Sequence, residues 1–491
     1  MKIAIFASEV VPYAKTGGLA DVAGALPRYL SLLGCDVKIF LPLYREVRKK
    51  SLPLEKVIDG AGIEWDVSGG KEGASTTLGK ASFSIWEHDA GPFKAYFIEK
   101  DDYYDRDYLY GTASGDYPDN GERFGFYAKA SLEALKRLDF SPEIVHCHDW
   151  QSAVALAYLK FVHAEDPFFK GARSLFTIHN LAYQGLFERD ILVKIGLPGS
   201  LFKMNDLEFY GKVNFLKAGI LYATAVSTVS PRYSREIQTP EMGCGLDGLL
   251  RTRRDSLFGI MNGIDYAAWD PAVDKLIPAN FGPADLDGKA RCKTALIKEL
   301  GLGANPETPL IGMVTRLAGQ KGLDIVCEAL PDFFKWGYAL AVLGTGEEKI
   351  QNLLLKAQKE HPSQLGLKIA FDDRLARTIY AGSDLFLIPS KYEPCGLTQM
   401  YALKYGTIPV VRATGGLDDS IEEYNPAKNT GNGFKFGDCT AEAMMEAVNR
   451  AGRVYASKEK WTALIRDAMA CDFSWKRAAE VYLKLFTKLA A

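Results

Sequence analysis

The sequence predicts an α/β protein with two doubly wound domains. Short apolar runs recur along its 491 residues, and each is followed by a polar turn and a stretch with helical spacing. Apolar runs without alternation are typical of strands buried on both faces, and strands that alternate with helices favour parallel sheets. Ten such runs are many for one sheet, and the chain is long for one domain. We therefore expect two sheets in two domains.

Each predicted strand is a short apolar run bounded by polar residues. Five runs lie in the first half of the chain, at residues 2–9, 36–42, 143–150, 173–180 and 224–230. Five more lie in the second half, at residues 310–316, 338–344, 367–371, 385–390 and 408–414. Because the N-terminal run is short and interrupted by Glu9, we interpret it as a strand of the mature chain and not as a signal peptide.

The predicted boundary between the domains lies near residue 255. A glycine-rich turn at 242–245, a charge run at 251–255 and a proline- and glycine-rich region at 271–288 separate the two sets of runs. We assign residues 1–255 to an N-terminal domain and 256–473 to a C-terminal domain, which the run at 257–265 opens. Residues 474–491 read as a closing helix with one apolar stripe, formed by Trp475, Ala478, Tyr482, Leu485 and Leu489.

Composition narrows the class of protein. The chain has 59 Lys and Arg against 61 Asp and Glu, a net charge of −2, which argues against a nucleic-acid partner. No run approaches the roughly 20 apolar residues of a membrane span, so no membrane partner is expected. The eight cysteines form no C-x-x-C pair, and the six histidines show no H-E-x-x-H spacing. This usage predicts a reducing, cytoplasmic location and asks for no metal.

Two glycine turns follow predicted strands, at 15–19 and at 414–417. Glycine lets backbone amides approach a ligand, and ligands of open α/β sheets lie beyond the carboxyl ends of strands. The paired turns favour one cleft lined from both domains, and Lys15 beside Gly17 and Gly18 suits a phosphate. Alternatively, each Gly-Gly only makes a tight turn. Neither turn has the spacing of a P-loop or a dinucleotide fingerprint.

Cations and a turn follow two predicted strands of the second domain. Arg316 and Lys321 come after the run at 310–316, where two permanent charges would neutralise a diphosphate and stabilise its departure. The alternative is a solvated loop with two ordinary cations. The segment 390–398 follows the run at 385–390, and its Glu393 could accept hydrogen bonds from sugar hydroxyls. Alternatively, Glu393 is an exposed loop carboxylate and Cys395 a small buried filler.

Polar and aromatic residues follow two strands of the first domain, at 146–150 and 179–185. Their histidine, Asp and Asn side chains can hydrogen-bond a polyol, and their aromatic rings can stack on a sugar. A metal site of His146, His148 and His179 is a weaker alternative, and structural histidines are another. The acid- and tyrosine-rich segment 101–108 would suit a carbohydrate acceptor, but the interpretation preferred here is an ordinary solvated loop.

Six motifs in order resemble the family of bacterial glycogen synthases and plant starch synthases. They are KTGGLADVAGALP at 15–27, HCHDW at 146–150, HNLAYQG at 179–185, MNGID at 261–265, TRLAGQKG at 315–322 and YEPCGLTQMYAL at 392–403. The resemblance implies the GT-B fold, with two Rossmann-like domains that face across a cleft and a C-terminal helix that returns to the first domain. It also implies retaining transfer of glucose from ADP-glucose to the non-reducing end of an α-1,4-glucan, without a cofactor or metal. The oligomeric state stays open.

The resemblance also implies roles for single residues. Arg316 and Lys321 would bind the diphosphate, which Lys15, Gly17 and Gly18 would approach on closure. The glucose would be held by Glu393, Cys395, Gly396 and Leu397, with Thr398 at the phosphates. The family pattern assigns the glucosyl unit to His179 and Asn262, and the acceptor or donor orientation to Asp21 and Asp149.

The chain departs from related transferases at three places, one of which is Ala318-Gly319, where a bulkier pair is more usual. Tyr401 stands where the E-x7-E pattern has its second glutamate, and Gln151 stands where bacterial relatives commonly have histidine. Ribose recognition is therefore expected elsewhere. Two other functions stay open, namely a related GT-B transferase that uses UDP-glucose and a glucan-binding homologue without turnover. A phosphorylase is disfavoured, since no lysine marks a pyridoxal phosphate site.

Overall fold

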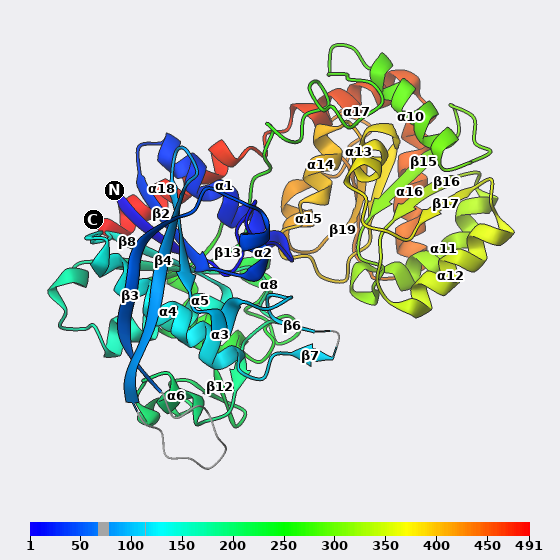
Figure 1. The fold of residues 1–491 in the computed structure, drawn as a ribbon. Coiled ribbons are helices and arrows are strands. Elements are labelled where there is room, and N and C mark those ends of the chain that lie inside the picture. The colour runs from blue at the N-terminus through cyan, green and yellow to red at the C-terminus, as the bar shows by residue number, and fades with distance from the viewer. Residues whose placement is uncertain (67–77, 113) are drawn as a thin grey trace. The chain divides into compact units, whose positions relative to one another are not determined.

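The computed structural model describes residues 1–66, 78–112 and 114–491. The chain forms two compact units (Figure 1). Unit 1 comprises residues 1–229, 234–260 and 475–491, and unit 2 comprises residues 230–233 and 261–474. In the part of the chain that is described, no helix is both long and apolar enough to cross a bilayer.

Unit 1 is built on a nine-stranded sheet with the order β14-β13-β9-β8-β1-β2-β5-β4-β3. Its strands are β1 (Lys2–Phe6), β2 (Asp36–Pro42), β3 (Glu55–Asp66), β4 (Leu78–Asp89), β5 (Lys94–Glu99), β8 (Ile144–His148), β9 (Arg173–Ile178), β13 (Ala225–Thr228) and β14 (Leu257–Gly259). The strands from β14 to β5 pair in parallel, whereas β4 and β3 are antiparallel at one edge. All five residues of β8 are buried, which requires cover on both faces of the sheet.

The helices of unit 1 cover this sheet. They are α1 (Gly18–Leu32), α2 (Arg45–Lys49), α3 (Asp101–Tyr104), α4 (Asn120–Arg137), α5 (Asp149–Phe161), α6 (Ile191–Lys194), α7 (Phe215–Tyr222), α9 (Asp247–Thr252) and α18 (Trp475–Ala490), while α8 (Pro231–Glu236) begins among the residues of unit 2. Two small sheets add β6 (Gly111–Thr112) with β7 (Gly115–Asp116), and β10 (Leu186–Phe187) with β12 (Lys212–Asn214) and β11 (Glu208–Phe209). Short 3₁₀ turns lie at Pro167–Phe169, Gly199–Leu201 and Arg254–Ser256.

Unit 2 is built on a six-stranded parallel sheet with the order β17-β16-β15-β18-β19-β20. Its strands are β15 (Leu310–Val314), β16 (Ala339–Leu343), β17 (Leu365–Lys368), β18 (Leu385–Ile388), β19 (Ile408–Arg412) and β20 (Phe434–Phe436). Its helices are α10 (Asp287–Glu299), α11 (Leu323–Lys335), α12 (Glu348–Glu360), α13 (Asp373–Gly382), α14 (Thr398–Lys404), α15 (Gly415–Ser420), α16 (Ala441–Tyr455) and α17 (Lys458–Ala470), with the 3₁₀ turn η4 (Gly319–Lys321).

Nine of the ten apolar runs contain a strand of one of the two large sheets, and the run at 367–371 overlaps the end of β17, so the Rossmann-like architecture is confirmed. One assignment is wrong. The run at 257–265 does not open the second domain, because its strand β14 pairs with β13 in unit 1, with Leu257 opposite Val226. The first unit therefore extends to Ile260 and not to residue 255. A short apolar edge strand carries no sign of which sheet it joins.

The closing helix α18 belongs to unit 1, where it packs against α1 (Figure 1). Its apolar stripe is the buried face, and the Phe486 and Tyr482 rings each lie 5.6 Å from the His146 ring at the sheet centre. A segment more than 200 residues from the rest of unit 1 thus completes the core of that unit.

Replacing Phe486 by alanine should weaken unit 1. Because the ring is fully buried, Phe486→Ala is expected to lower the free energy of unfolding by about 3 kcal/mol through lost burial and a cavity. Val481 lies on the same helix with 44% of its surface exposed, so Val481→Ala is the matched control and should change stability by under about 0.5 kcal/mol. Denaturant unfolding measures both variants, and equal losses would contradict the packing of α18.

Candidate active site

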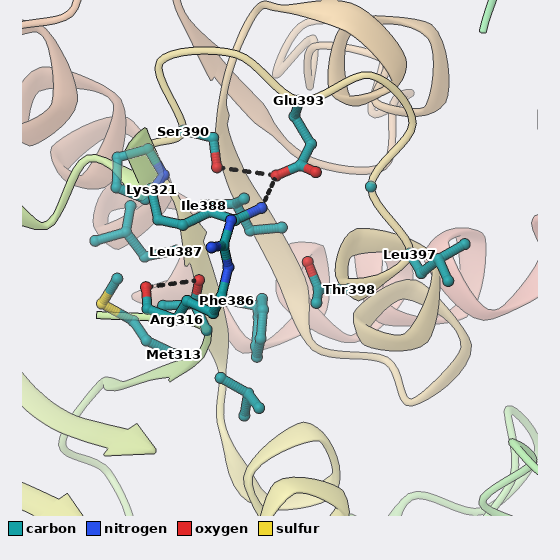
Figure 2. A pocket seen from close by; sticks show the side chains of 14 residues that line it. Met313, Arg316, Lys321, Phe386, Leu387, Ile388, Ser390, Glu393, Leu397 and Thr398 are labelled. Atoms are coloured by element: carbon teal, nitrogen blue, oxygen red, sulfur yellow. Dashed lines mark hydrogen bonds and ion pairs between the residues drawn. The ribbon is translucent and has the colours of Figure 1, made fainter. Parts of the chain in front are cut away.

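A pocket of about 240 Å³ lies at the carboxyl edge of the sheet in unit 2 (Figure 2). The segments that follow β15 and β18, two adjacent strands, supply most of its wall. Its lining is Met313, Val314, Thr315, Arg316, Lys321, Phe386, Leu387, Ile388, Pro389, Ser390, Glu393, Gly396, Leu397 and Thr398. Parallel strands end at one edge, so loops distant in sequence meet there.

An ion pair stands at the centre of the polar wall. Lys321 Nζ lies 2.5 Å from Glu393 Oε2, and both side chains are more than four-fifths buried. The Ser390 hydroxyl donates to the same carboxylate oxygen at 3.1 Å, as Figure 2 shows. The pair fixes the ammonium at the pocket, where it retains donors for an anion.

Arg316 is the second cation of the pocket. Its guanidinium donates to Gln320 Oε1 at 2.9 Å, and Gln320 in turn donates to the carbonyl of Tyr392 at 3.1 Å. The amide of Lys391 donates back to the Gln320 carbonyl at 2.9 Å. Gln320 thus links the turn after β15 to the loop after β18. The two positive charges of Arg316 and Lys321 exceed the single negative charge of Glu393.

Gly322 allows these two loops to touch. It adopts a left-handed conformation with φ of 72°, and a Cβ there would lie 2.1 Å from the Pro389 carbonyl oxygen. Any residue with a Cβ at this position would push the two loops apart. The glycine therefore keeps Lys321 within reach of Glu393.

The turn from Glu393 to Thr398 forms the opposite wall. Gly396 is left-handed, with φ of 69°, and Thr398 is the first residue of α14. Cys395 is buried behind the turn, and burial raises the pKa of its thiol to about 12. The buried Asn262 opposes this rise in pKa from beside the thiol, so Asn262 and Cys395 lie together behind the turn.

The glycine turn at 414–417 packs against this wall. A Cβ on Gly415 or Gly416 would lie 2.0 Å from the backbone oxygen of Glu393 or Cys395, respectively. The Gly416 amide also donates to the Glu393 carbonyl at 3.1 Å. The tight turn therefore has a packing role, and its place beside a ligand cleft stays a prediction.

The glycine turn of unit 1 has a different environment. Gly17 is extended, and no atom of the described residues lies within 4 Å of a Cβ placed on Gly17 or Gly18. Lys15 is half exposed and forms an ion pair with Asp21 at 2.7 Å. The turn is anchored by the buried carboxylate of Glu9, which accepts from the Thr16 hydroxyl at 2.6 Å and the Gly17 amide at 3.0 Å.

The histidines and Asp149 form a second cluster in unit 1. His148 Nδ1 lies 2.9 Å from His179 Nε2, and Asp149 accepts the His179 amide at 2.8 Å. Burial lowers the pKa of His146 and His179 to about 3, so both rings are neutral at pH 7. Burial, with a smaller contribution from the charge of Glu9, raises the pKa of Asp149 to about 7. Among the described residues no cluster with the makings of a metal site is found, and the metal alternative gains no support.

The structure thus brings the predicted residues into three groups. Arg316, Lys321, Glu393, Gly396, Leu397 and Thr398 line one pocket in unit 2, with Asn262 and Cys395 behind it. In unit 1, Lys15, Gly17, Gly18 and Asp21 share a turn and helix start, while Asp149 and His179 form the buried cluster. Sequence reasoning missed Glu9, Gln320 and Ser390. Only Glu9 carried a signal, as a carboxylate directly after a buried strand.

Tyr401 and Gln151, which depart from the family pattern, and the acidic segment 101–108 all make contacts within the chain. The Tyr401 ring stacks on Trp269 at 3.9 Å, and Gln151 is buried on α5. The segment 101–108 differs from the expected solvated loop, because its first four residues form α3 with Tyr104 buried, while ion pairs such as Arg45 with Asp105 at 2.7 Å hold the residues that follow.

Comparisons with known proteins agree along the whole chain. The family model described as starch synthase catalytic domain matches residues 2–252, and that described as glycosyl transferases group 1 matches residues 299–464. The glycogen synthase of Syntrophotalea carbinolica is 46% identical over 488 residues, and these cover 99% of each chain. The glycogen synthase of Geotalea daltonii is 46% identical over 493 residues, which cover all of this chain and 99% of the relative.

Solved structures give the same result. The catalytic domain of starch synthase IV from Arabidopsis thaliana, bound to ADP and acarbose, superposes with a TM-score of 0.87 and 33% identity over 100% of this chain and 99% of that chain. A sucrose-phosphate synthase from Thermosynechococcus elongatus shares the fold, with a TM-score of 0.60 and 15% identity over 99% of this chain and 98% of that chain.

The raised pKa of Asp149 makes a pH-dependent prediction for stability. Between its ordinary pKa of about 4 and the folded value of about 7, only the folded chain binds this proton, so the carboxyl destabilises the fold increasingly as pH rises. Asp149→Asn should therefore raise the free energy of unfolding by about 2 kcal/mol more at pH 8 than at pH 5. Denaturant unfolding at both pH values measures this, with the exposed Asp190→Asn as control. A gain independent of pH would contradict the assignment.

Proposed function

We propose ADP-glucose as the glucosyl donor of this chain, which belongs to the family of bacterial glycogen synthases and plant starch synthases. The chain is a glycosyltransferase with the GT-B fold and elongates an α-1,4-glucan. The observation that carries this proposal is the pocket of unit 2, where Arg316 and Lys321 stand together at the sheet edge. The arabidopsis relative bound to ADP supports the choice of nucleotide.

The pocket suits a sugar diphosphate. A diphosphate carries negative charge that increases as the glucosyl bond breaks, and two permanent cations at a fixed position stabilise that charge. Lys321 is held by Glu393 and needs little reorganisation when the donor binds. We assign the diphosphate to Arg316 and Lys321, with Thr398 at the phosphates.

Glu393 has two tasks in this proposal. It holds Lys321, and it presents a carboxylate to the hydroxyls of the glucose beside Gly396 and Leu397. Of the described residues that line the pocket, Glu393 is the one carboxylate, and its Oε2 already accepts from Lys321 and Ser390. We therefore do not assign it as a nucleophile for a covalent intermediate.

We propose a same-face route to retention. The bond between the anomeric carbon and the phosphate oxygen breaks, and its electrons pass to the diphosphate. The acceptor hydroxyl attacks the anomeric carbon from the same face, and its proton passes to the departing phosphate oxygen. The protein contributes charge stabilisation by Arg316 and Lys321 and exclusion of water.

The remaining predicted residues receive the roles that the family resemblance implies. Lys15, Gly17 and Gly18 suit phosphate and glucose, and the openness around both glycines supports this role. His179 in unit 1 and Asn262 in unit 2 are proposed for the glucosyl unit, and Asp21 and Asp149 for the acceptor or for donor orientation. A metal-free reaction and a cytoplasmic location complete the proposal, and cysteine usage supports the location.

Nucleotide release tests the donor. The purified chain with glycogen should release ADP from ADP-glucose much faster than UDP from UDP-glucose, and the ADP should require glycogen. A chelator should leave the rate unchanged. Faster release of UDP would replace the proposed donor, and glycogen binding without either product would favour the homologue that lacks turnover.

Removing the Lys321 ammonium should reduce turnover steeply. Because it stabilises charge that develops as the diphosphate leaves, Lys321→Ala is expected to lower kcat about 100-fold. Lys391 is the matched control, since it lies at the same sheet edge but pairs with Asp324 and is 44% exposed. Lys391→Ala should keep kcat within about twofold in steady-state assays. Near-normal kcat in Lys321→Ala would remove Lys321 from the mechanism.

A further inference from the structure

The Glu9 carboxylate collects four hydrogen bonds although only 4% of the residue is exposed. Its Oε1 accepts from the Thr16 hydroxyl at 2.6 Å and from the Tyr110 hydroxyl at 2.7 Å. Its Oε2 accepts from the Gly17 amide at 3.0 Å and from the Thr16 amide. Three of the four donors belong to the turn that precedes α1.

All four donors are neutral groups, namely two amides and two hydroxyls. A buried carboxylate is costly unless hydrogen bonds stabilise it, and bonds to a charged acceptor are stronger than neutral ones. The charge of Glu9 and the conformation of the turn are therefore coupled. The turn satisfies the carboxylate, and the carboxylate fixes the turn.

The fixed turn carries the groups proposed to meet the donor. Lys15 precedes Thr16, and Gly18 follows Gly17, so both flank the two anchored amides. The Lys15 side chain is half exposed, and a Cβ at Gly17 or Gly18 would meet no atom of the described chain within 4 Å. Glu9 holds the inner side of the turn and leaves its outer side open.

Glu9 also links this turn to other parts of unit 1. Burial of the Tyr110 hydroxyl raises its pKa well above the usual value, and this hydroxyl lies 2.7 Å from Ser8 Oγ. The negative charge of Glu9 contributes to the raised pKa of Asp149, after burial. The Glu9 side chain thus anchors the turn by hydrogen bonds and acts on Asp149 through its charge.

We propose that Glu9 is a positioning residue for catalysis, which holds the turn of Lys15, Gly17 and Gly18 in the conformation that engages the donor. The proposal rests on the proposed function, because it assumes that this turn acts on the donor. Glu9 itself touches no substrate in this scheme. It acts through the amides of Thr16 and Gly17.

Hydrogen exchange tests the anchoring without any substrate. Glu9→Gln keeps the size of the side chain but removes its charge and one of its two acceptor oxygens, so the bonds that hold the turn weaken even where a hydroxyl turns to accept from the new amide. The amides of Thr16 and Gly17 should then exchange at least tenfold faster, while those within α1 keep their protection. Glu133→Gln, which removes a carboxylate that pairs with Arg137 on α4, is the matched control and should leave both amides unchanged. Unchanged exchange in Glu9→Gln would overturn the proposal.

Kinetics test the consequence for catalysis. Glu9→Gln should lower kcat/KM for ADP-glucose at least tenfold, with the KM for glycogen within about twofold, since misplaced binding groups cost rate. The pKa of Asp149 should also fall in this variant, because the negative charge of Glu9, which helps to raise it, is gone, while the neighbours His148 and His179 stay neutral. Normal kcat/KM with loosened amides would overturn the catalytic part.

Milder variants keep the test valid if Glu9→Gln does not fold. Thr16→Val and Tyr110→Phe each remove one hydroxyl bond to Glu9, and Thr16→Val should have the larger effect on kcat/KM because it loosens the turn itself. Equal, small effects would overturn the proposal. Failure of the proposed function is distinct, since the wild-type chain would then release no nucleotide, whereas the exchange experiment would still report whether Glu9 anchors the turn.

Discussion

Close contacts between the backbones of neighbouring loops maintain the shape of the pocket in unit 2. Gly322 lets the turn after β15 lie against Pro389, and Gly415 and Gly416 let a third loop lie against the segment at Glu393 and Cys395. Peptide groups are stiff and close together there, so the charged side chains have little freedom to drift. The short ion pair between Lys321 and Glu393 depends on this packing.

The two units fix their functional groups by different physics. In unit 2, three glycines bring peptide groups into contact, and this contact positions the charged side chains of the pocket. In unit 1, one buried charge comes first, because Glu9 organises the turn around its carboxylate. Close packing tolerates changes of charge but not of volume, whereas a carboxylate anchor tolerates neither loss of charge nor loss of its donors.

Much of the fold could be predicted because parallel strands buried on both faces leave a plain signal. Nine such runs contain a strand and the tenth overlaps the end of one, while β3 and β4, at an antiparallel edge with mixed burial, gave no such run. The strand β14 was assigned to the wrong domain because three apolar residues do not reveal their neighbour. Arg316, Lys321 and Glu393 could be found from their places after strands. Gln320 and Ser390 could not, since their role depends on hydrogen bonds across the sheet edge.

The glycines of this chain carry two kinds of information. At Gly322, Gly415 and Gly416 a side chain would collide with other atoms of the chain, so packing within the protein requires glycine there. At Gly17 and Gly18 the described chain leaves ample room, and their conformation does not demand glycine at residue 17. A side chain added at either position would therefore cost the fold little, and its effect would fall on the proposed contact between this turn and the donor.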